Sequence, residues 1–352
     1  RGSFRAGPRC LPLNIALLCL APAPCLASKI PPCFGRFIIL RQYCIPAGLA
    51  RASKGATALK RKLSVDLAFM FPCLFAFLMV IICPFFLGIY YSMTDWNGVR
   101  ESINFIGFEN FRGMFHQPQF LYSFMMTVAY TLINVLLVNL VSFFLSLLVT
   151  GQARLRNLYR AGFFVPNLIG GIVLGYIWQF LFNYVFTLAG ATIPFLGKSL
   201  IARADTVIWA MSFVNTWQYA GYIMMIYVAS IQSVPTSVME AASVDGASYF
   251  TRMRRVLIPM MANAFTISLF LTLTNSFKQF DMNFTLTNGG PSARFMGGAV
   301  KASQLLAMDI YNTANGANKM AEAQAKSVVF FLVLVVFSLV QVYFNKRKEV
   351  EM

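Results

Sequence analysis

The chain has 352 residues, of which 58% are apolar and only 12% are charged. Soluble domains contain about 25% charged and about 45–50% apolar residues, so an ordinary soluble fold is excluded, and so is disorder for most of the length. The net charge of +17 gathers at one end, because residues 1–62 hold eleven Lys/Arg and no Asp/Glu. The other 290 residues hold eighteen Lys/Arg and twelve Asp/Glu, a net charge of only +6. This low charge argues against nucleic acid as a partner.

The first segment, 1–62, is basic and rich in Cys and Pro. A secretory signal would show the same features: a basic start, an apolar patch at 11–20 and a cleavage site at Ala27-Ser28. The preferred interpretation is translated upstream sequence or a cloning remnant, with the native start near 59–65. We expect the segment to be non-native or disordered. Five of the seven cysteines lie there without a Cys-x-x-Cys pair, and His116 is the one histidine, so no metal site is expected.

Six long apolar runs follow, and each is long enough to cross a membrane, which takes about 20 apolar residues. We therefore expect residues 63–352 to form an all-α, polytopic membrane domain embedded in lipid. The predicted spans, numbered one to six in chain order, cover about 67–91, 121–149, 161–185, 206–233, 259–281 and 325–345.

The Lys/Arg residues between the spans predict the topology, because short cytoplasmic loops are enriched in them. Four basic clusters fall on one side of a six-span chain, whereas the other side carries mixed charges. This pattern predicts a multi-pass protein of the cell membrane with both termini in the cytoplasm. The clusters are Lys60-Arg61-Lys62, then Arg154, Arg156 and Arg160, then Arg252, Arg254 and Arg255, and finally Lys346-Arg347-Lys348.

A phosphate-binding motif is only approximated, at Gly190…Gly197-Lys198-Ser199. Its glycines are seven residues apart instead of five, and it falls on the non-cytoplasmic side. We therefore expect this chain to bind neither ATP nor another cofactor. No pair of catalytic carboxylates and no Ser/His arrangement is present, so an enzyme is not expected.

The loop at 234–258, between spans four and five, reads Glu240-Ala-Ala-Ser-Val-Asp-Gly-Ala247. Ala241, Ala242 and Ala247 are small enough to let another backbone approach closely. Gly246 supplies a sharp bend, and Asp245 is suited to capping a second helical piece. Two interpretations stay open on these residues alone: a surface helix that docks on a partner, and a re-entrant turn that packs against neighbouring spans.

This segment, with Pro259 about a dozen residues later, resembles the coupling motif of importer-type ABC transporter permeases. Other segments are similar to the permeases of binding-protein-dependent carbohydrate importers, over about 64–352. The resemblance departs at Asn315, Ala321 and Ser327. The similar segments are Asn215-Thr-Trp217, Tyr222-Ile-Met-Met-Ile, Pro235, Phe280-Asp281, Leu286-Thr-Asn-Gly-Gly-Pro291, Tyr311-Asn-Thr-Ala314 and the end Gln341…Glu349-Val-Glu-Met352.

The resemblance implies the six-helix fold of a type I ABC importer permease. It implies a second permease forming a heterodimer, two cytoplasmic ATPase subunits that hydrolyse the ATP, an extracellular sugar-binding protein, and a sugar, expected to be an oligosaccharide, as cargo. It also implies that the loop couples to the ATPase through Glu240, Ala241, Ala242, Asp245, Gly246, Ala247 and Pro259.

Polar side chains inside spans are costly in lipid and should face an interior, so they are candidates for the sugar path. Span five offers Thr272, Asn275, Ser276 and Gln279 on one helical face, and span four offers Asn215, Tyr219 and Tyr222. The resemblance implies that Asn215 and Tyr222 line a sugar site. The alternative is hydrogen bonding between helices. Lys278 and Asp281 are expected to form a structural ion pair.

Three other function classes fit less well. A secondary, ion-coupled transporter of a small polar solute is the main alternative, but it calls for an ionisable residue near the midplane and internal repeats, and neither is seen. An intramembrane enzyme would need a nucleophile and a base. A channel would show charge rings or a filter motif.

Overall fold

The computed structural model describes residues 66, 69–151, 155–190, 193 and 197–346. The chain divides into two units, Arg1–Phe69 and Met70–Met352, and the helix bundle is formed by the second. The predicted N-terminal segment 1–62 lies outside the described residues, and so do its five cysteines and the basic cluster that ends it.

Four helices of the described chain are long and apolar enough to cross a membrane by themselves. Two further candidates are helix pairs with a sharp internal bend, so that there are up to six spans. The four helices are Phe69–Ser92, Pro118–Thr150, Gly171–Ala189 and Met320–Asn345. The bent pairs are Val207–Ser233 with Thr236–Val244, at 68°, and Tyr249–Met260 with Ala262–Phe277, at 70°.

The four helices and the two bent pairs overlap the six predicted runs, and the largest differences fall in the third and fifth. A separate helix, α5 (Arg156–Phe164), takes the first residues of the predicted third span. The helix is interrupted before α6 (Gly171–Phe180) by Pro166, which has no N–H to donate, and by the Gly170-Gly171 pair. The fifth span bends near Met261 for the same kind of reason, because Pro259 precedes it.

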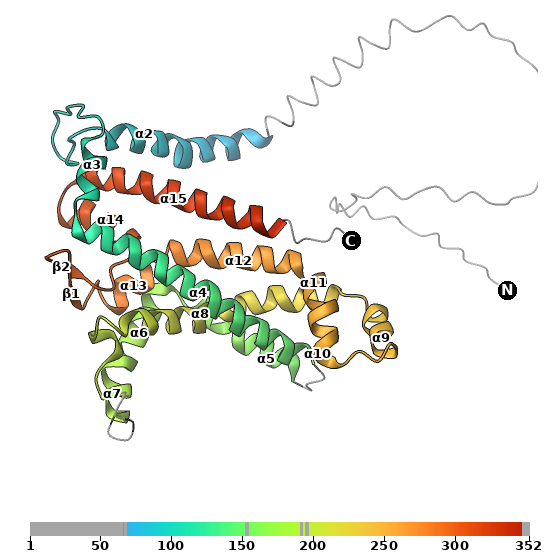
Figure 1. Ribbon diagram of the computed structural model, residues 1–352. Coiled ribbons are helices and arrows are strands. Elements are labelled where there is room, and N and C mark those ends of the chain that lie inside the picture. The colour runs from blue at the N-terminus through green and yellow to red at the C-terminus, as the bar shows by residue number, and fades with distance from the viewer. Residues whose placement is uncertain (1–65, 67–68, 152–154, 191–192, 194–196, 347–352) are drawn as a thin grey trace, which may run out of the picture. The chain divides into compact units, whose positions relative to one another are not determined.

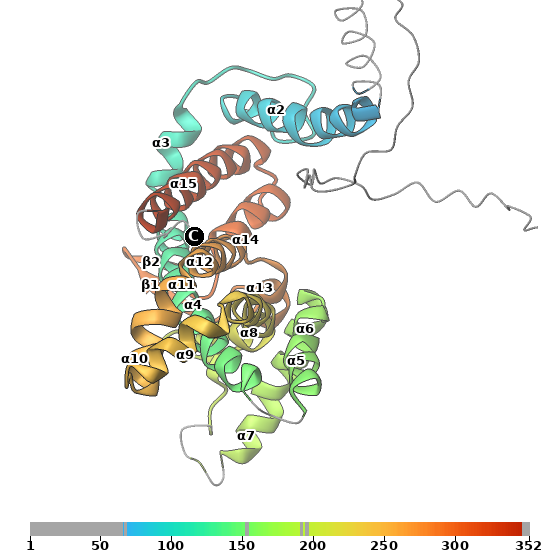
Figure 2. The same ribbon diagram turned by 90° about the vertical axis from the view of Figure 1, so that its right-hand side faces the viewer.

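The central helix is α4 (Pro118–Thr150), which packs against both α8 (Val207–Ser233) and α12 (Ala262–Phe277). On the far side of α12 lies α15 (Met320–Lys346), and α2 (Cys83–Ser92) packs on α15, as Figures 1 and 2 show. The face of α4 that packs inward carries small and polar side chains at intervals of three or four residues. They are Ser123, Thr127, Tyr130, Asn134, Ser142 and Ser146, all of them buried, with the apolar Val138 completing the spacing between Asn134 and Ser142.

Two groups of short elements lie at opposite ends of the long helices (Figure 1). One end has α13 (Asp281–Leu286), α14 (Leu306–Tyr311) and a hairpin of β1 (Ser292–Phe295) and β2 (Gly298–Lys301). The hairpin is antiparallel with Ser292 opposite Lys301. The other end has α9 (Thr236–Val244), α10 (Tyr249–Arg252) and α11 (Ile258–Met260).

The remaining elements are short and complete the connections between these helices. They are the helices α3 (Glu109–Phe115) and α7 (Phe186–Ala189), the 3-10 turns η2 (Val165–Leu168) and η5 (Leu200–Ala202), and the π-helical turns η1 (Leu78–Ile82), η3 (Leu181–Val185), η6 (Met253–Leu257) and η7 (Asn312–Gly316).

Candidate functional site

A polar pocket of about 490 Å³ lies where α8, α12 and the broken third span meet. Its size is in the range of small-molecule sites, about 300–1,000 Å³. Amide, hydroxyl, charged and aromatic side chains all reach it. The lining residues are Asn167, Gly171, Gln218, Tyr219, Leu271, Thr274, Asn275, Lys278, Gln279, Phe280 and Asp281.

The break before α6 helps to form this pocket. Because the helix stops at Pro166, the carbonyl of Ile169 is not used by a helical N–H, and the side-chain amide of Gln218 donates to it at 2.9 Å. Gly171 lets α13 approach, since a Cβ there would stand 2.9 Å from the Cβ of Asp281. The polar wall of the pocket therefore depends on an interrupted helix and on a glycine.

Two charged residues of the pocket, Lys278 and Asp281, are exposed. Four ion pairs join side chains in the described chain, and neither residue belongs to one of them. The predicted ion pair between them is therefore wrong. Lys278 ends α12 and Asp281 starts α13, so the intervening turn separates the two charges. Both remain available to a molecule in the pocket.

The seven predicted path residues divide into two groups. Tyr219, Asn275 and Gln279 line the polar pocket. Tyr222 lies just behind them, with its ring 5.4 Å from that of Tyr219. Asn215, Thr272 and Ser276 are buried between helices instead.

A ladder of side-chain hydrogen bonds accounts for two of the buried residues. Asn215 donates to the Oδ1 atom of Asn134 at 2.8 Å, and Thr272 accepts from Asn139 at 3.3 Å. The hydroxyl of Tyr227 donates to Asn139 at 2.7 Å and also meets Ser268. These contacts join α4 to α8 and α12. The partners on α4 were not predicted from the sequence, in which they are visible only as two amide side chains inside span two.

The loop between α8 and α12 turns at Gly246, which has a φ of +78°. The N–H of Ala247 donates to Ala242 and that of Gly246 to Ser243, both at 3.1 Å, which is the Schellman ending of a helix. Glu240, Ala241, Asp245 and Gly246 are exposed, as is Pro259 beyond α10, while Ala242 and Ala247 are half-buried.

The predicted cap of the second helical piece differs in the structure. Ser248 is the N-cap of α10, and its hydroxyl accepts from the N–H of Thr251 at 3.3 Å. Asp245 lies at the C-terminal end of α9 instead. The prediction was wrong by three residues because Gly246 ends α9 in a Schellman motif, which sets the start of α10 further along the chain.

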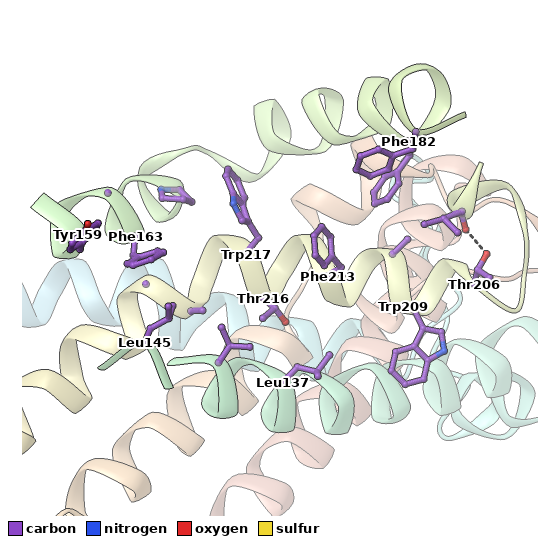
Figure 3. A pocket seen from close by; sticks show the side chains of 18 of the residues that line it. Leu137, Leu145, Tyr159, Phe163, Phe182, Thr206, Trp209, Phe213, Thr216 and Trp217 are labelled. Atoms are coloured by element: carbon purple, nitrogen blue, oxygen red, sulfur yellow. Dashed lines mark hydrogen bonds between the residues drawn. The ribbon is translucent and has the colours of Figure 1, made fainter. Parts of the chain in front are cut away.

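A second, larger cavity of about 1,180 Å³ lies against α4, α5 and α8. Figure 3 shows Trp209, Phe213 and Trp217 on α8 with Phe163 of α5 and Phe182 around it. Of the two threonines labelled there, Thr206 donates its hydroxyl to the carbonyl of Leu200 at 2.7 Å, and Thr216 is the other. An almost wholly apolar lining offers few hydrogen bonds to a polar ligand, so the smaller pocket is the better candidate site.

The chain matches known proteins over most of its length. It is 42% identical to the probable starch degradation products transport system permease protein AmyD of Thermoanaerobacterium thermosulfurigenes, over 81% of this chain and 94% of that protein. It is 26% identical to the multiple sugar-binding transport system permease protein MsmF of Streptococcus mutans, over 76% and 90%.

The fold is shared with a bacterial ABC transporter involved in the import of the acidic polysaccharide alginate. The TM-score is 0.70 at 18% identity, with 84% of this chain and 99% of that chain covered. Residues 142–350 match the family described as binding-protein-dependent transport system inner membrane component. The chain therefore belongs to this family of multi-pass inner membrane components, the permease subunits of ABC importers, which leave ATP hydrolysis to a separate subunit.

Proposed function

We propose that this permease translocates an uncharged oligosaccharide, such as a product of starch breakdown, through the polar pocket. The observation that carries the proposal is the lining of that pocket, where Gln218, Asn275 and Gln279 stand beside the rings of Tyr219 and Phe280. Sugar hydroxyls need hydrogen bonds, and the C–H faces of a sugar pack on aromatic rings. The names of the relatives AmyD and MsmF point to the same class of cargo.

The charges of the pocket support a neutral cargo. Lys278 and Asp281 contribute one charge of each sign, so the lining has no net charge from these two residues. An anionic ligand would be attracted by one and repelled by the other. A relative named for sn-glycerol-3-phosphate transport, UgpA of Pectobacterium atrosepticum, is 27% identical, so a phosphorylated cargo is the competing hypothesis.

We also propose the partner subunits of this permease, from its family and from the exposed residues of the loop around α9. A binding protein delivers the sugar, which passes through a heterodimer of this chain and a second permease. The loop around α9 docks on one of two cytoplasmic ATPase subunits, which places both termini in the cytoplasm. Val244 is 88% exposed and Phe250 63%, so this end offers apolar surface to a partner, and Arg254 and Arg255 add positive charge.

Uptake by the assembled importer in proteoliposomes tests the cargo. The permease is co-purified with its partner subunits, the binding protein is added, and entry of radiolabelled maltotriose is measured with ATP inside. We expect ATP-dependent uptake that unlabelled sn-glycerol-3-phosphate does not inhibit. Lys278→Met should lower uptake about tenfold through the loss of hydrogen bonds. The matched control is Lys198→Met, in an exposed loop away from the pocket.

Two results would overturn the proposal. Strong inhibition by sn-glycerol-3-phosphate would show an anionic cargo, and equal uptake by Lys278→Met and Lys198→Met would show that the pocket is not on the path.

A further inference from the structure

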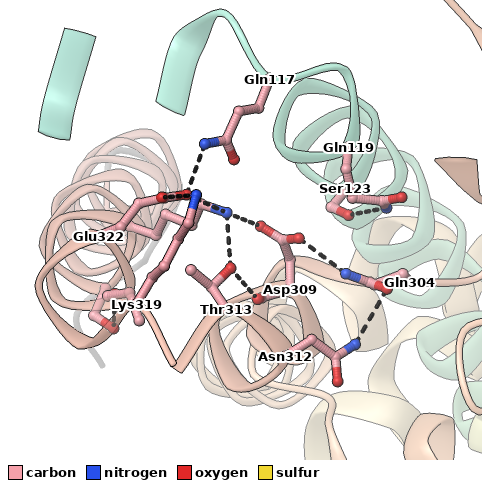
Figure 4. Close-up of polar contacts among 12 residues, drawn as sticks. Gln117, Gln119, Ser123, Gln304, Asp309, Asn312, Thr313, Lys319 and Glu322 are labelled. Atoms are coloured by element: carbon pink, nitrogen blue, oxygen red, sulfur yellow. Dashed lines mark hydrogen bonds and ion pairs between the residues drawn. The ribbon is translucent and has the colours of Figure 1, made fainter. Parts of the chain in front are cut away.

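A buried cluster of charges lies at the hairpin end of the long helices, outside the polar pocket. Lys326 of α15 is 2% exposed, and its ammonium makes two hydrogen bonds and a further ion pair. Its ammonium lies 3.0 Å from Asp309 Oδ2, 2.8 Å from Thr313 Oγ1 and 3.4 Å from Glu322 Oε1 (Figure 4). The buried ammonium thus has two hydrogen-bond acceptors and two carboxylates as neighbours.

The carboxylates of the cluster are satisfied as well. Gln304 donates to Asp309 at 2.9 Å, and Gln117 donates to Glu322 at 2.7 Å. Lys319, on the exposed side, pairs with Glu322 at 3.3 Å, which makes the cluster neutral overall. Apolar residues often replace a buried ion pair at no loss of stability, so such a pair is weak evidence for stability and better evidence for a defined geometry.

The segment that the lysine holds is too short to be stable alone. α14 has six residues and η7 five, far fewer than an isolated helix needs. Its start is fixed by Leu306, whose N–H donates to Thr127 of α4 at 2.8 Å. Its far half is fixed by Asp309 and Thr313 on Lys326. The ammonium is therefore one of the anchors of this segment, besides the Leu306 bond to α4 and the hydrogen bond from Asn312 to Gln304.

Tyr311 lies between Asp309 and Thr313, the two residues of this segment that Lys326 binds, and it contacts the wall of the pocket. Its ring centroid is 5.1 Å from that of Phe280 and 5.6 Å from that of Phe284. Two residues along a helix correspond to about 200°, so Asp309 and Tyr311 point to opposite sides of α14. One side meets the lysine, and the other meets Phe280, which lines the polar pocket.

We infer that Lys326 is a positioning residue, which anchors α14 so that Tyr311 holds Phe280 as the outer wall of the polar pocket. The inference rests on the proposed function, because it takes that pocket to be the sugar path. Lys326 itself does not line the pocket, so it acts through Tyr311.

The test compares three variants in the assembled importer. Asp309→Asn combined with Lys326→Met removes the anchor and leaves no unpaired charge, since a single change would strand a buried ion. Tyr311→Leu removes the ring contact and leaves the charges in place. The control, Lys319→Met, makes the same lysine change at the exposed edge, where the side chain is 61% exposed.

The first readout does not depend on sugar. Asn275→Cys, in a background free of other cysteines, reports access to the pocket through its rate of labelling by a membrane-impermeant maleimide. We expect the anchor variant and Tyr311→Leu each to raise that rate about three- to tenfold, and the two together to raise it no further. Unchanged labelling in the anchor variant, or fully additive effects, would overturn the inference.

The second readout is maltotriose imported per ATP hydrolysed, with Asn275 unchanged. A merely structural role lowers both quantities in proportion and leaves their ratio unchanged, whereas a displaced wall lowers the ratio. We expect the ratio to fall about three- to tenfold in the anchor variant and to stay at the wild-type value in Lys319→Met. A wild-type importer that takes up no maltotriose would overturn the proposed cargo, while the labelling rates would still decide the role of Lys326.

Discussion

The side-chain amide of Asn215 donates a 2.8 Å hydrogen bond to Oδ1 of Asn134, which links α8 to α4 in the interior of the helix bundle. Asn134 in turn donates to Ser212 and to the carbonyl of Tyr130. Each bond of this kind between membrane helices contributes about 0.6 kcal/mol, and up to about 2. Asn215 thus has a packing partner, whereas Asn275 faces the polar pocket.

The two asparagines should respond differently to substitution by alanine. We expect Asn215→Ala to lower the thermal unfolding temperature in detergent, because the buried acceptor on Asn134 loses its donor, with a cost of about 1–2 kcal/mol. Asn275→Ala should leave unfolding almost unchanged and lower maltotriose uptake per assembled importer. If Asn215→Ala keeps the wild-type unfolding temperature but loses uptake, Asn215 belongs to the sugar path instead.

Gly246 offers a test of coupling that separates backbone shape from steric fit. A Cβ at this position meets nothing within 4 Å, so a larger residue is excluded only by the φ of +78°. We expect Gly246→Val to abolish ATP hydrolysis stimulated by the loaded binding protein, because a β-branched residue resists this conformation. Gly246→Asn should retain most of it, since Asn tolerates positive φ. Equal loss in both variants would indicate that the docked partner needs the glycine surface itself.

α8 packs closely on α5 at Gly221. A Cβ there would overlap the carbonyl oxygen of Phe163, which is backbone and cannot turn aside. We expect Gly221→Ala to destabilise the protein by about 1–3 kcal/mol or more, and to lower the amount of folded protein in the membrane. Gly162→Ala is the control, because a Cβ at that helical position meets nothing. Equal yields and unfolding temperatures would contradict the close packing of α8 on α5.

The orientation in the membrane is open to a labelling experiment. Single cysteines at Ser102 and Asn288 should react with an impermeant maleimide added to intact cells, and those at Asn157 and Ser248 only after the membrane is opened. All four positions are exposed. The pattern follows from the positive-inside distribution of Lys and Arg. Reaction of Ser248→Cys in intact cells would reverse the proposed orientation.

The positions of the membrane helices were predictable from sequence because lipid requires long uninterrupted apolar runs. The surroundings of the polar residues within these helices were harder to predict. Asn275 and Asn215 both look like interior polar groups, and only the partner Asn134, 81 residues away in sequence, distinguishes them. The small and polar residues along α4 recur at helical spacing in the sequence, so the inward face of that helix was predictable, but its individual partners were not.

The charged cluster was missed for a different reason. Lys326 begins the predicted sixth span and resembles a flanking charge, whereas α15 begins at Met320 and places it in the second turn. Asp309, on a short segment between spans, resembles a surface charge. Their pairing depends on how that segment folds back onto α15, which no local pattern specifies. A salt bridge between residues 17 apart, at the edge of a span, has no sequence signature of its own.

The ending of α9 has a consequence for how importers of this kind diversify. The turn after α9 is held by main-chain hydrogen bonds from Gly246 and Ala247, so its conformation requires only one glycine. The outward side chains of Glu240, Val244 and Asp245 take no part in those main-chain bonds. If this loop docks on an ATPase subunit as proposed, these side chains can change with the ATPase surface while the turn at Gly246 keeps the same geometry. Exchanging these outward side chains between permeases should therefore allow one permease to pair with a different ATPase subunit.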